Sequence, residues 1–279
     1  MEKPTGQDFS GLSKEQIRDF WIDFSNRTDF RNPIFSYGYY KAIKDNLNQI
    51  TVFNHVIKGE EKFFTRARLH HSKRTLFPNI SDLWYPPDEI TNVGRGNFPN
   101  NSVFYCSNDP GTTVFEMRPK KNDWLTTIEV EIQKDSLDLL VLGINTDTNS
   151  AYHRLPEFDK GINLFLEQKF REIIPNGKEF NYFKTAYFVE AFIKNKDGIM
   201  YPSVGSNCKG MNVIFTKEFI DNFAKFKKAV VHEVTEKNSE YDISVNCKYI
   251  AKEINEFGDF IWKTVSDCVG HQITENIYD

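Results

Sequence analysis

The sequence lacks the features that mark membrane and secreted proteins. No stretch of its 279 residues approaches the roughly 18 consecutive apolar residues of a membrane span. The first residues, MEKPTGQDFS, do not show the basic and then apolar order of a secretory signal peptide. These absences predict a cytoplasmic protein with no membrane partner.

Cysteine and histidine are also scarce. The four cysteines form no CxxC pair, which argues against a zinc knuckle or a dense disulfide framework and predicts buried reduced thiols: Cys106, Cys208, Cys247 and Cys268. His70 and His71 are adjacent, so on an extended segment they point to opposite sides, and no third ligand has a recognisable spacing. We therefore predict no metal site and interpret His153 and His232 as structural or surface residues.

An excess of basic residues is absent as well. The 35 Lys and Arg against 39 Asp and Glu give a net charge of −4. This balance argues against a nucleic-acid binder that would use the basic residues Arg66, Arg68, Lys73 and Arg74. It excludes a strongly basic surface but leaves room for a local basic pocket.

Aromatic residues, in contrast, are abundant. The chain contains 25 Phe and 12 Tyr but only four Trp and four Met, so a core must be filled largely by Phe. Such a composition predicts an ordered chain. Its length fits one large domain or one domain with a substantial extension.

The N-terminal segment has the pattern of two helices. Ser13 and Gln16 have the spacing of a capping box, and an apolar stripe follows, which predicts a helix over Lys14–Asn26. The turn-like RNPIFSYG separates it from a second helix over Tyr39–Asn48. We place the end of this N-terminal helical extension at residue 58.

After this extension the sequence consists of short runs rich in Phe, Val, Ile and Thr, as in the strands of a mixed sheet. The expected strands are Lys62–Arg68, Val103–Ser107, Leu125–Ile132, Leu137–Leu142, Ile199–Tyr201, Met211–Thr216 and, in the tail, 229–236 and 241–250. Helical stripes occur around Ile162–Ile173 and Tyr187–Phe192, and a last helix is expected over Ala251–Trp262. The predicted class is α+β, a mixed β-sheet core with flanking helices.

Two groups of arginines are candidates for anion binding. Arg66 and Arg68 lie two residues apart on an expected strand, so both point to one face, where the bidentate fork of Arg suits phosphate. An exposed strand face is the structural alternative. Arg95 stands between two glycines at the end of a long loop over 82–99, where the backbone can approach a ligand closely. A surface turn with a solvated Arg95 is the alternative there.

Two further residues are candidates for catalysis. Glu116 lies on a short helix that Thr112 or Thr113 can cap and that Pro119 ends. A carboxylate among apolar neighbours must be paired, for example with Arg118, or used in chemistry. Ser203 follows a strand and a proline but has neither a nearby His nor a GxSxG elbow, so it is a poor nucleophile whose hydroxyl could still bind a ligand.

Four segments in this order resemble the RES domain family: FFTRAR, YPPDEITNVGRGN, SVFYCSNDPGTTVFEMRP and KTAYFVEAFIKNKDGIMYPSVGSNCKGMNVIF. The resemblance implies a fold like that of ADP-ribosyltransferases and the degradation of NAD⁺ by toxins of RES–Xre toxin–antitoxin modules. It identifies Arg66, Glu116 and Ser203 as the signature residues and matches Arg95 and Tyr105 to further active-site positions. Arg68 is expected to support Arg66.

The resemblance also implies roles. Glu116 would stabilise an oxocarbenium-like state at the ribose, and the arginines would bind the pyrophosphate. Tyr105 would stack on nicotinamide, and Ser203 would contribute a hydrogen bond that positions the substrate. NAD⁺ is then the substrate, and no cofactor or metal is required. Hydrolysis, phosphorolysis and ADP-ribose transfer to a macromolecule remain open, as does a non-catalytic nucleotide sensor.

The expected organisation has three parts: an N-terminal extension over 1–58, a RES domain over 59–226 and a C-terminal extension over 227–279. The two extensions could contact an Xre-like antitoxin, form a homodimer or sense a trigger, and the sequence does not choose among these.

Overall fold

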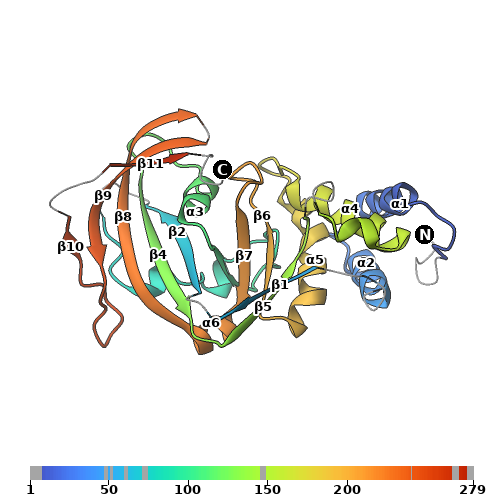
Figure 1. Cartoon of the computed structure of the whole chain (residues 1–279), viewed down its shortest axis with the longest axis horizontal. Helices are drawn as coiled ribbons and strands as arrows, with labels where there is room; N and C mark the ends of the chain where they lie inside the picture. The colour runs from blue at the N-terminus through green and yellow to red at the C-terminus, as the bar shows by residue number, and fades with distance from the viewer. Residues whose placement is uncertain are drawn as a thin grey trace. The chain divides into compact units, whose positions relative to one another are not determined.

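The chain forms two compact units, shown in Figure 1. The computed structural model describes residues 8–46, 50, 53–59, 62–70, 75–144, 149–239, 241–265 and 270–274. The first unit takes its described residues from 1–56, 88–101 and 138–202, and the second takes its residues from 57–87, 102–137 and 203–279. None of the helices in these described ranges is long and apolar enough to cross a membrane.

The first unit contains four α-helices: α1 (Lys14–Arg27), α2 (Pro33–Asn46), α4 (Glu157–Arg171) and α5 (Phe183–Phe192). The capping box predicted for α1 is confirmed, because the Ser13 hydroxyl accepts from the Gln16 N–H and the Gln16 side chain accepts from the Ser13 N–H. Helices are confirmed at α4 and α5, but Ile173 of the first predicted stripe lies beyond α4 and is exposed. In the second predicted stripe, Tyr187–Phe192, only Phe188 of the apolar residues named by the pattern is buried.

Helix α2 begins six residues before its predicted start. Pro33 occupies its first turn, where the missing N–H costs no hydrogen bond, and the Asn32 side chain accepts from the N–H of Ile34 at 3.0 Å. The prediction of a turn over RNPIFSYG is therefore wrong from Pro33 on, and only Arg31 and Asn32 form a turn. Leu47 and Asn48, at the predicted end, lie outside the described residues.

Aromatic side chains fill the core between these helices, as the phenylalanine content predicts. The Trp21 ring lies 6.4 Å from that of Tyr39, 6.1 Å from that of Phe165 and 6.0 Å from that of Phe188, as measured between centroids. All four side chains are almost completely buried. Such clusters add edge-to-face attraction to the burial of large apolar surfaces.

Three strands border these helices. They are β1 (Phe53–Lys58), which was not predicted, β5 (Ser136–Val141) and β6 (Gly198–Pro202). Strands β5 and β6 run parallel, with Leu139 opposite Gly198 and Val141 opposite Met200. The chain passes from one unit to the other within β1 and β5.

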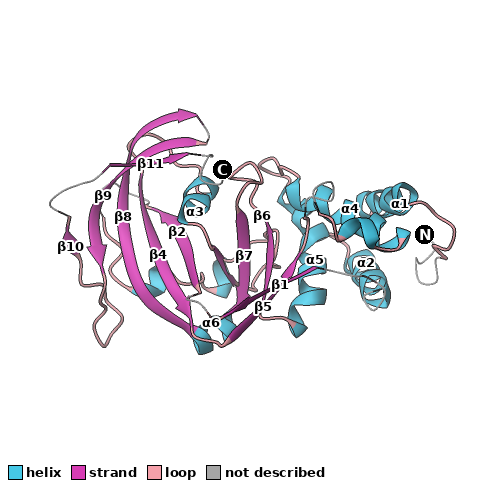
Figure 2. Ribbon diagram, in the orientation of Figure 1, coloured by secondary structure: helices cyan, strands magenta, loops and turns pink. Residues whose placement is uncertain are grey.

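Antiparallel strands build the second unit (Figure 2). In spatial order they are β7 (Met211–Thr216), β3 (Val103–Ser107), β2 (Phe63–Leu69), β4 (Trp124–Ile132), β8 (Ala224–Ser239), β9 (Asp242–Ala251) and β10 (Lys263–Thr264), and β11 (Gly270–Thr274) also pairs with β9. Helices α3 (Pro110–Glu116) and α6 (Lys217–Phe223) complete the unit. The α+β class and mixed strand pairing are confirmed, whereas α6 was not predicted.

The tail departs from prediction after β9. The predicted helix over 251–262 is wrong, because Ala251 ends β9 and a turn follows it. The Asn255 side chain accepts from the N–H groups of Phe257 and Asp259, and Gly258 has a φ of +83°. Ile254 then pairs with Phe260 as an isolated bridge. The sequence places the end of the RES domain between residues 226 and 227, and both of these residues lie inside the continuous strand β8.

Several single turns of 3₁₀ helix connect these elements. They lie at Ile80–Asp82, Asp88–Ile90, Tyr152–Arg154, Glu179–Tyr182 and Ile193–Asn195. Two of them lie in or beside the long loop predicted over 82–99, which therefore has local order of its own.

Candidate functional site

Helix α3 carries Glu116 at its last position. Asp109 caps the helix, since its carboxylate accepts from the N–H groups of Gly111 and Thr112 and from the Thr112 hydroxyl. The predicted cap at Thr112 or Thr113 is therefore wrong, because Asp109 precedes Pro110, which suits the first helical position. This cap fixes the short helix and with it the carboxylate at the other end.

Three donors converge on one oxygen of Glu116. Its Oε1 accepts from the Ser203 hydroxyl at 2.5 Å, the Asn212 side-chain amide at 2.7 Å and the Gly205 N–H at 3.1 Å. Hydrogen bonds of this kind complement a negative charge and are stronger than neutral ones. Within the described residues, Oε2 has no hydrogen-bond partner and is not completely buried, so it is available to a ligand.

The Ser203 hydroxyl is part of this support and not a surface group. Ser203 is fully buried, and its hydroxyl also accepts from the N–H of Ser206 at 3.1 Å. Its backbone N–H donates to the Gly210 carbonyl at 2.8 Å, while its carbonyl accepts from Cys208. Ser203 therefore positions Glu116, which agrees with its poor prospects as a nucleophile.

Sequence reasoning missed two of the three donors, Asn212 and Gly205. Gly205 approaches Glu116 so closely that a Cβ would lie 2.7 Å from the Glu116 Cα. Gly210 has a similar constraint, because a Cβ there would lie 1.9 Å from the Thr112 hydroxyl oxygen. The two glycines in SVGSNCKGMN were the available signal for a close backbone approach.

Tyr105 lies on the same side of the sheet as Asn212. Ser107 on β3 is paired with Asn212 on β7, and Tyr105 is two residues from Ser107. Because side chains alternate along a strand, those of Tyr105, Ser107 and Asn212 share one face. The half-buried ring of Tyr105 thus lies on the face from which Asn212 reaches Glu116.

Arg66 lies where β2 and β3 separate. These strands pair only at Thr65 and Ser107, and beyond that pair the Arg66 guanidinium donates to the Tyr105 carbonyl at 3.1 Å. It also lies 5.8 Å from the Phe104 ring centroid, and its buried Nε has no hydrogen bond within the described residues. Burial lowers the pKa of Arg66 to about 10, so the side chain keeps its charge at neutral pH.

Strand β2 places Arg66 and Arg68 on one face, as predicted, but Glu116 is not joined to them. Ala67, between them, packs in the core with Val114 and Phe115 of α3, so the arginines point to the other face. Arg68 there donates to the Asp82 carbonyl and lies 5.5 Å from the Phe77 ring centroid. Among the described residues, no hydrogen bond or ion pair links either arginine to Glu116.

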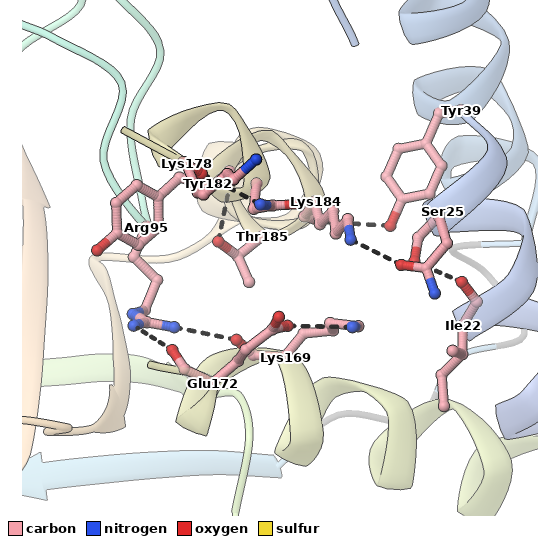
Figure 3. A network of polar contacts seen from close by, with 12 residues as sticks. Ile22, Ser25, Tyr39, Arg95, Lys169, Glu172, Lys178, Tyr182, Lys184 and Thr185 are labelled. Carbon is pink, nitrogen blue, oxygen red and sulfur yellow. Dashed lines mark hydrogen bonds and ion pairs between the residues drawn. The ribbon is translucent and has the colours of Figure 1, made fainter. Parts of the chain in front are cut away.

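Arg95 belongs to the first unit, where it binds the end of α4 (Figure 3). Its guanidinium donates to the carbonyls of Lys169 and Glu172, both at 3.0 Å, and lies 5.3 Å from the Tyr182 ring centroid. A cation at this position satisfies carbonyls that have no partner in the helix and complements the helix dipole. The alternative of a solvated surface arginine is therefore wrong.

His70 makes structural contacts through both ring nitrogens. His70 bonds through one ring nitrogen to the Thr75 carbonyl and through the other to the Thr126 hydroxyl, both at 2.7 Å, and burial lowers its pKa. In the described ranges no group of three or more His, Cys, Asp or Glu side chains could hold a metal ion. His71, Lys73 and Arg74 lie outside those ranges.

Comparison with known families gives one match. The model of the RES domain matches residues 65–235, which is more than half of the chain and includes Arg66, Tyr105, Glu116, Ser203 and Asn212. No curated protein sequence matches the chain.

Proposed function

Because the chain belongs to the RES domain family, a family of NAD-related, toxin-like modules, we propose that it cleaves the nicotinamide–ribose bond of NAD⁺. Glu116 is the catalytic carboxylate of this proposal. One observation carries it: Oε1 of Glu116 is held by three hydrogen bonds, while Oε2 remains available to a ligand.

The chemistry suits a fixed carboxylate. Nicotinamide leaves with the electron pair of the glycosidic bond, so positive charge develops at the ribose in an oxocarbenium-like state. Oε2 of Glu116 would stabilise that charge and accept a hydrogen bond from a ribose hydroxyl or from water. Addition of water at the ribose carbon yields ADP-ribose, nicotinamide and one proton, and addition of phosphate yields the phosphorylated sugar.

Other residues take supporting roles. Ser203, Gly205 and Asn212 are positioning residues, because they act through Oε1 and not on the substrate. Tyr105 offers an aromatic face for nicotinamide on the Glu116 side of the sheet. Arg66 supports Tyr105 through the carbonyl of that residue.

The phosphate-binding role of Arg95 remains a prediction from the family resemblance, as does that of Arg68. The contacts of Arg95 with α4 and those of Arg68 with Asp82 hold each guanidinium in a defined place. An ADP-ribosyltransferase-like fold and a toxin role restrained by an Xre-like antitoxin belong to the same proposal, and the family supports them.

An NAD⁺ assay with detection of nicotinamide tests the proposal. The purified full-length protein is expected to release nicotinamide, and Glu116→Gln is expected to lose most of the rate while keeping its fold. Glu131→Gln is a matched control, because it removes a carboxylate of the same unit that pairs with Lys227 at 3.3 Å. Binding of NAD⁺ without turnover would favour the nucleotide sensor and overturn the proposal.

The products separate the three reactions. Adding phosphate should convert the ADP-ribose product into ADP-ribose-1″-phosphate if phosphate is the nucleophile. Radiolabel from NAD⁺ that accumulates on protein would instead show ADP-ribose transfer to a macromolecule.

A further inference from the structure

A cysteine and a histidine lie side by side on β8 and β9, outside the residues assigned to NAD⁺ cleavage. His232 and Cys247 are direct partners in the register of the two strands, and the His232 Nδ1 lies 3.7 Å from the Cys247 Sγ. The other ring nitrogen, Nε2, lies 3.0 Å from the Thr127 hydroxyl oxygen on β4. We propose that Cys247 is a reactive thiol, activated by His232, that exchanges with small disulfides.

The contacts of Thr127 favour the tautomer of His232 with the proton on Nε2. The Thr127 hydroxyl donates to the Val230 carbonyl at 3.5 Å, which leaves its oxygen to accept from an Nε2–H of His232. Nδ1 then has a lone pair and accepts from the thiol of Cys247. A histidine held in this way by a third group is the arrangement that activates a nucleophile.

The local backbone also favours this pair. Register shifts between Val231 and His232, because Lys248 is an extra residue on β9 and forms a β-bulge next to Cys247. Bulges re-aim side chains and are frequent next to active sites. Lys248 itself pairs with Glu233 at 2.7 Å.

Apolar residues flank the pair along and across the strands. Leu125 lies opposite His232 on β4, and the next pair along β8 and β9 is Val234 with Val245. All three belong to the core cluster beneath α3. The imidazole of His232 is a titratable group in contact with Cys247, and we revise its interpretation as a merely structural or surface residue.

Accessibility distinguishes Cys247 from Cys106. Cys247 is partly exposed, whereas Cys106 is only 3% exposed and burial raises the pKa of its thiol. Since the thiolate is the nucleophile, a buried thiol with a raised pKa reacts slowly. Cys208 is also partly exposed and serves as an internal reference.

The step is a thiol–disulfide exchange. Nδ1 of His232 takes the thiol proton, and the Cys247 thiolate attacks one sulfur of a small disulfide such as glutathione disulfide. A new S–S bond forms, the original one breaks, and the departing thiolate takes up a proton from the imidazolium or from water. No net oxidant is required beyond the disulfide, and the step is independent of the proposed NAD⁺ cleavage.

Timed exposure of the full-length protein to glutathione disulfide, followed by peptide mapping, tests the proposal. At neutral pH we expect Cys247 to form the mixed disulfide about tenfold faster than Cys208, while Cys106 stays unmodified. The wild-type rate at Cys247 should rise with pH as the thiolate fraction grows. Equal rates at Cys247 and Cys208 would overturn the proposal.

Two variants separate activation by His232 from simple exposure. His232→Gln should slow exchange at Cys247 about tenfold at neutral pH and move its pH profile to higher pH, with no change at Cys208. Thr127→Val removes the hydroxyl that holds Nε2 but keeps the imidazole. It should also lower the rate of disulfide exchange at Cys247. An unchanged Cys247 rate in both folded variants would contradict the assigned role.

Discussion

The Ser203 hydroxyl donates a hydrogen bond of 2.5 Å to Oε1 of Glu116, across 87 positions of sequence. Ser203 is fully buried, and its hydroxyl joins the segment after β6 to the end of α3. Asn212 and Gly205 complete the support of the same oxygen. Three residues, two from the segment after β6 and one from β7, thereby fix one carboxylate at the end of α3.

Asn212→Ala should reduce the rate of NAD⁺ cleavage. It removes one donor to a charged oxygen, an interaction of about 1.5–3 kcal/mol, so kcat should fall about ten- to a hundredfold. Because Asn212 acts through Glu116, the KM for NAD⁺ should change little. Steady-state kinetics checks this, and a kcat equal to that of the wild type would contradict the positioning role.

Gly205→Ala should destabilise the protein. The added Cβ would lie 2.7 Å from the Cα and 2.8 Å from the backbone nitrogen of Glu116, which cannot rotate away. Such overpacking typically costs about 1–3 kcal/mol of unfolding free energy. Denaturant unfolding measures the change.

Gly38→Ala is the matched control for Gly205→Ala. A Cβ at Gly38 meets nothing within 4 Å, and the residue lies inside α2. The exchange should therefore stabilise the protein by about 0.5–1 kcal/mol, the opposite sign. Equal effects of the two exchanges would refute the close approach at Gly205.

The sequence was sufficient for elements whose signals are local. The capping box of α1 and the strands β3 and β7 have the predicted bounds within a residue, because side-chain periodicity and turn residues determine them. The turn at Asn255–Asp259 was missed because Asn255 bonds its own backbone neighbours, which overrides the apolar spacing of the segment.

The residues of the site were predictable only where a local motif contains them. Glu116 and Ser203 were identified from the amino-acid sequences of their motifs, and in the structure a hydrogen bond connects them. The role of Asn212 depends on the pairing of β3 with β7, and that of Gly205 on a contact with a distant helix. Neither relationship is visible in local sequence. The positions of Arg66 and Arg68 likewise depend on which face of β2 the helix α3 covers.

Asp109→Ala should loosen α3. The carboxylate accepts from two N–H groups and one hydroxyl at the start of the helix, and loss of such a cap costs about 0.5–2 kcal/mol. Thermal unfolding should show a lower midpoint. Asp109→Asn keeps a good capping group and should lie much closer to the wild type, so an equal loss in both variants would point to a cause other than capping.

Asp259 should titrate below an ordinary aspartate. Hydrogen bonds from the Asn79 side chain and then from Asn255 lower its pKa. Its contribution to stability is therefore present above the pKa of the unfolded chain and is lost as pH falls through the lower folded value. Asn79→Ala should raise the pKa of Asp259 toward its usual value, as carboxyl chemical shifts in an NMR titration would show. An unchanged titration would refute the assigned cause.

The rate of nicotinamide release from NAD⁺ by Glu116→Gln, measured beside the wild type and Glu131→Gln, tests the central claim most directly. The amide keeps the shape of the side chain but removes the charge that would stabilise an oxocarbenium-like state. We predict that Glu116→Gln loses most of the rate while the wild type and Glu131→Gln remain active. A folded Glu116→Gln protein that releases nicotinamide at the wild-type rate would contradict the account.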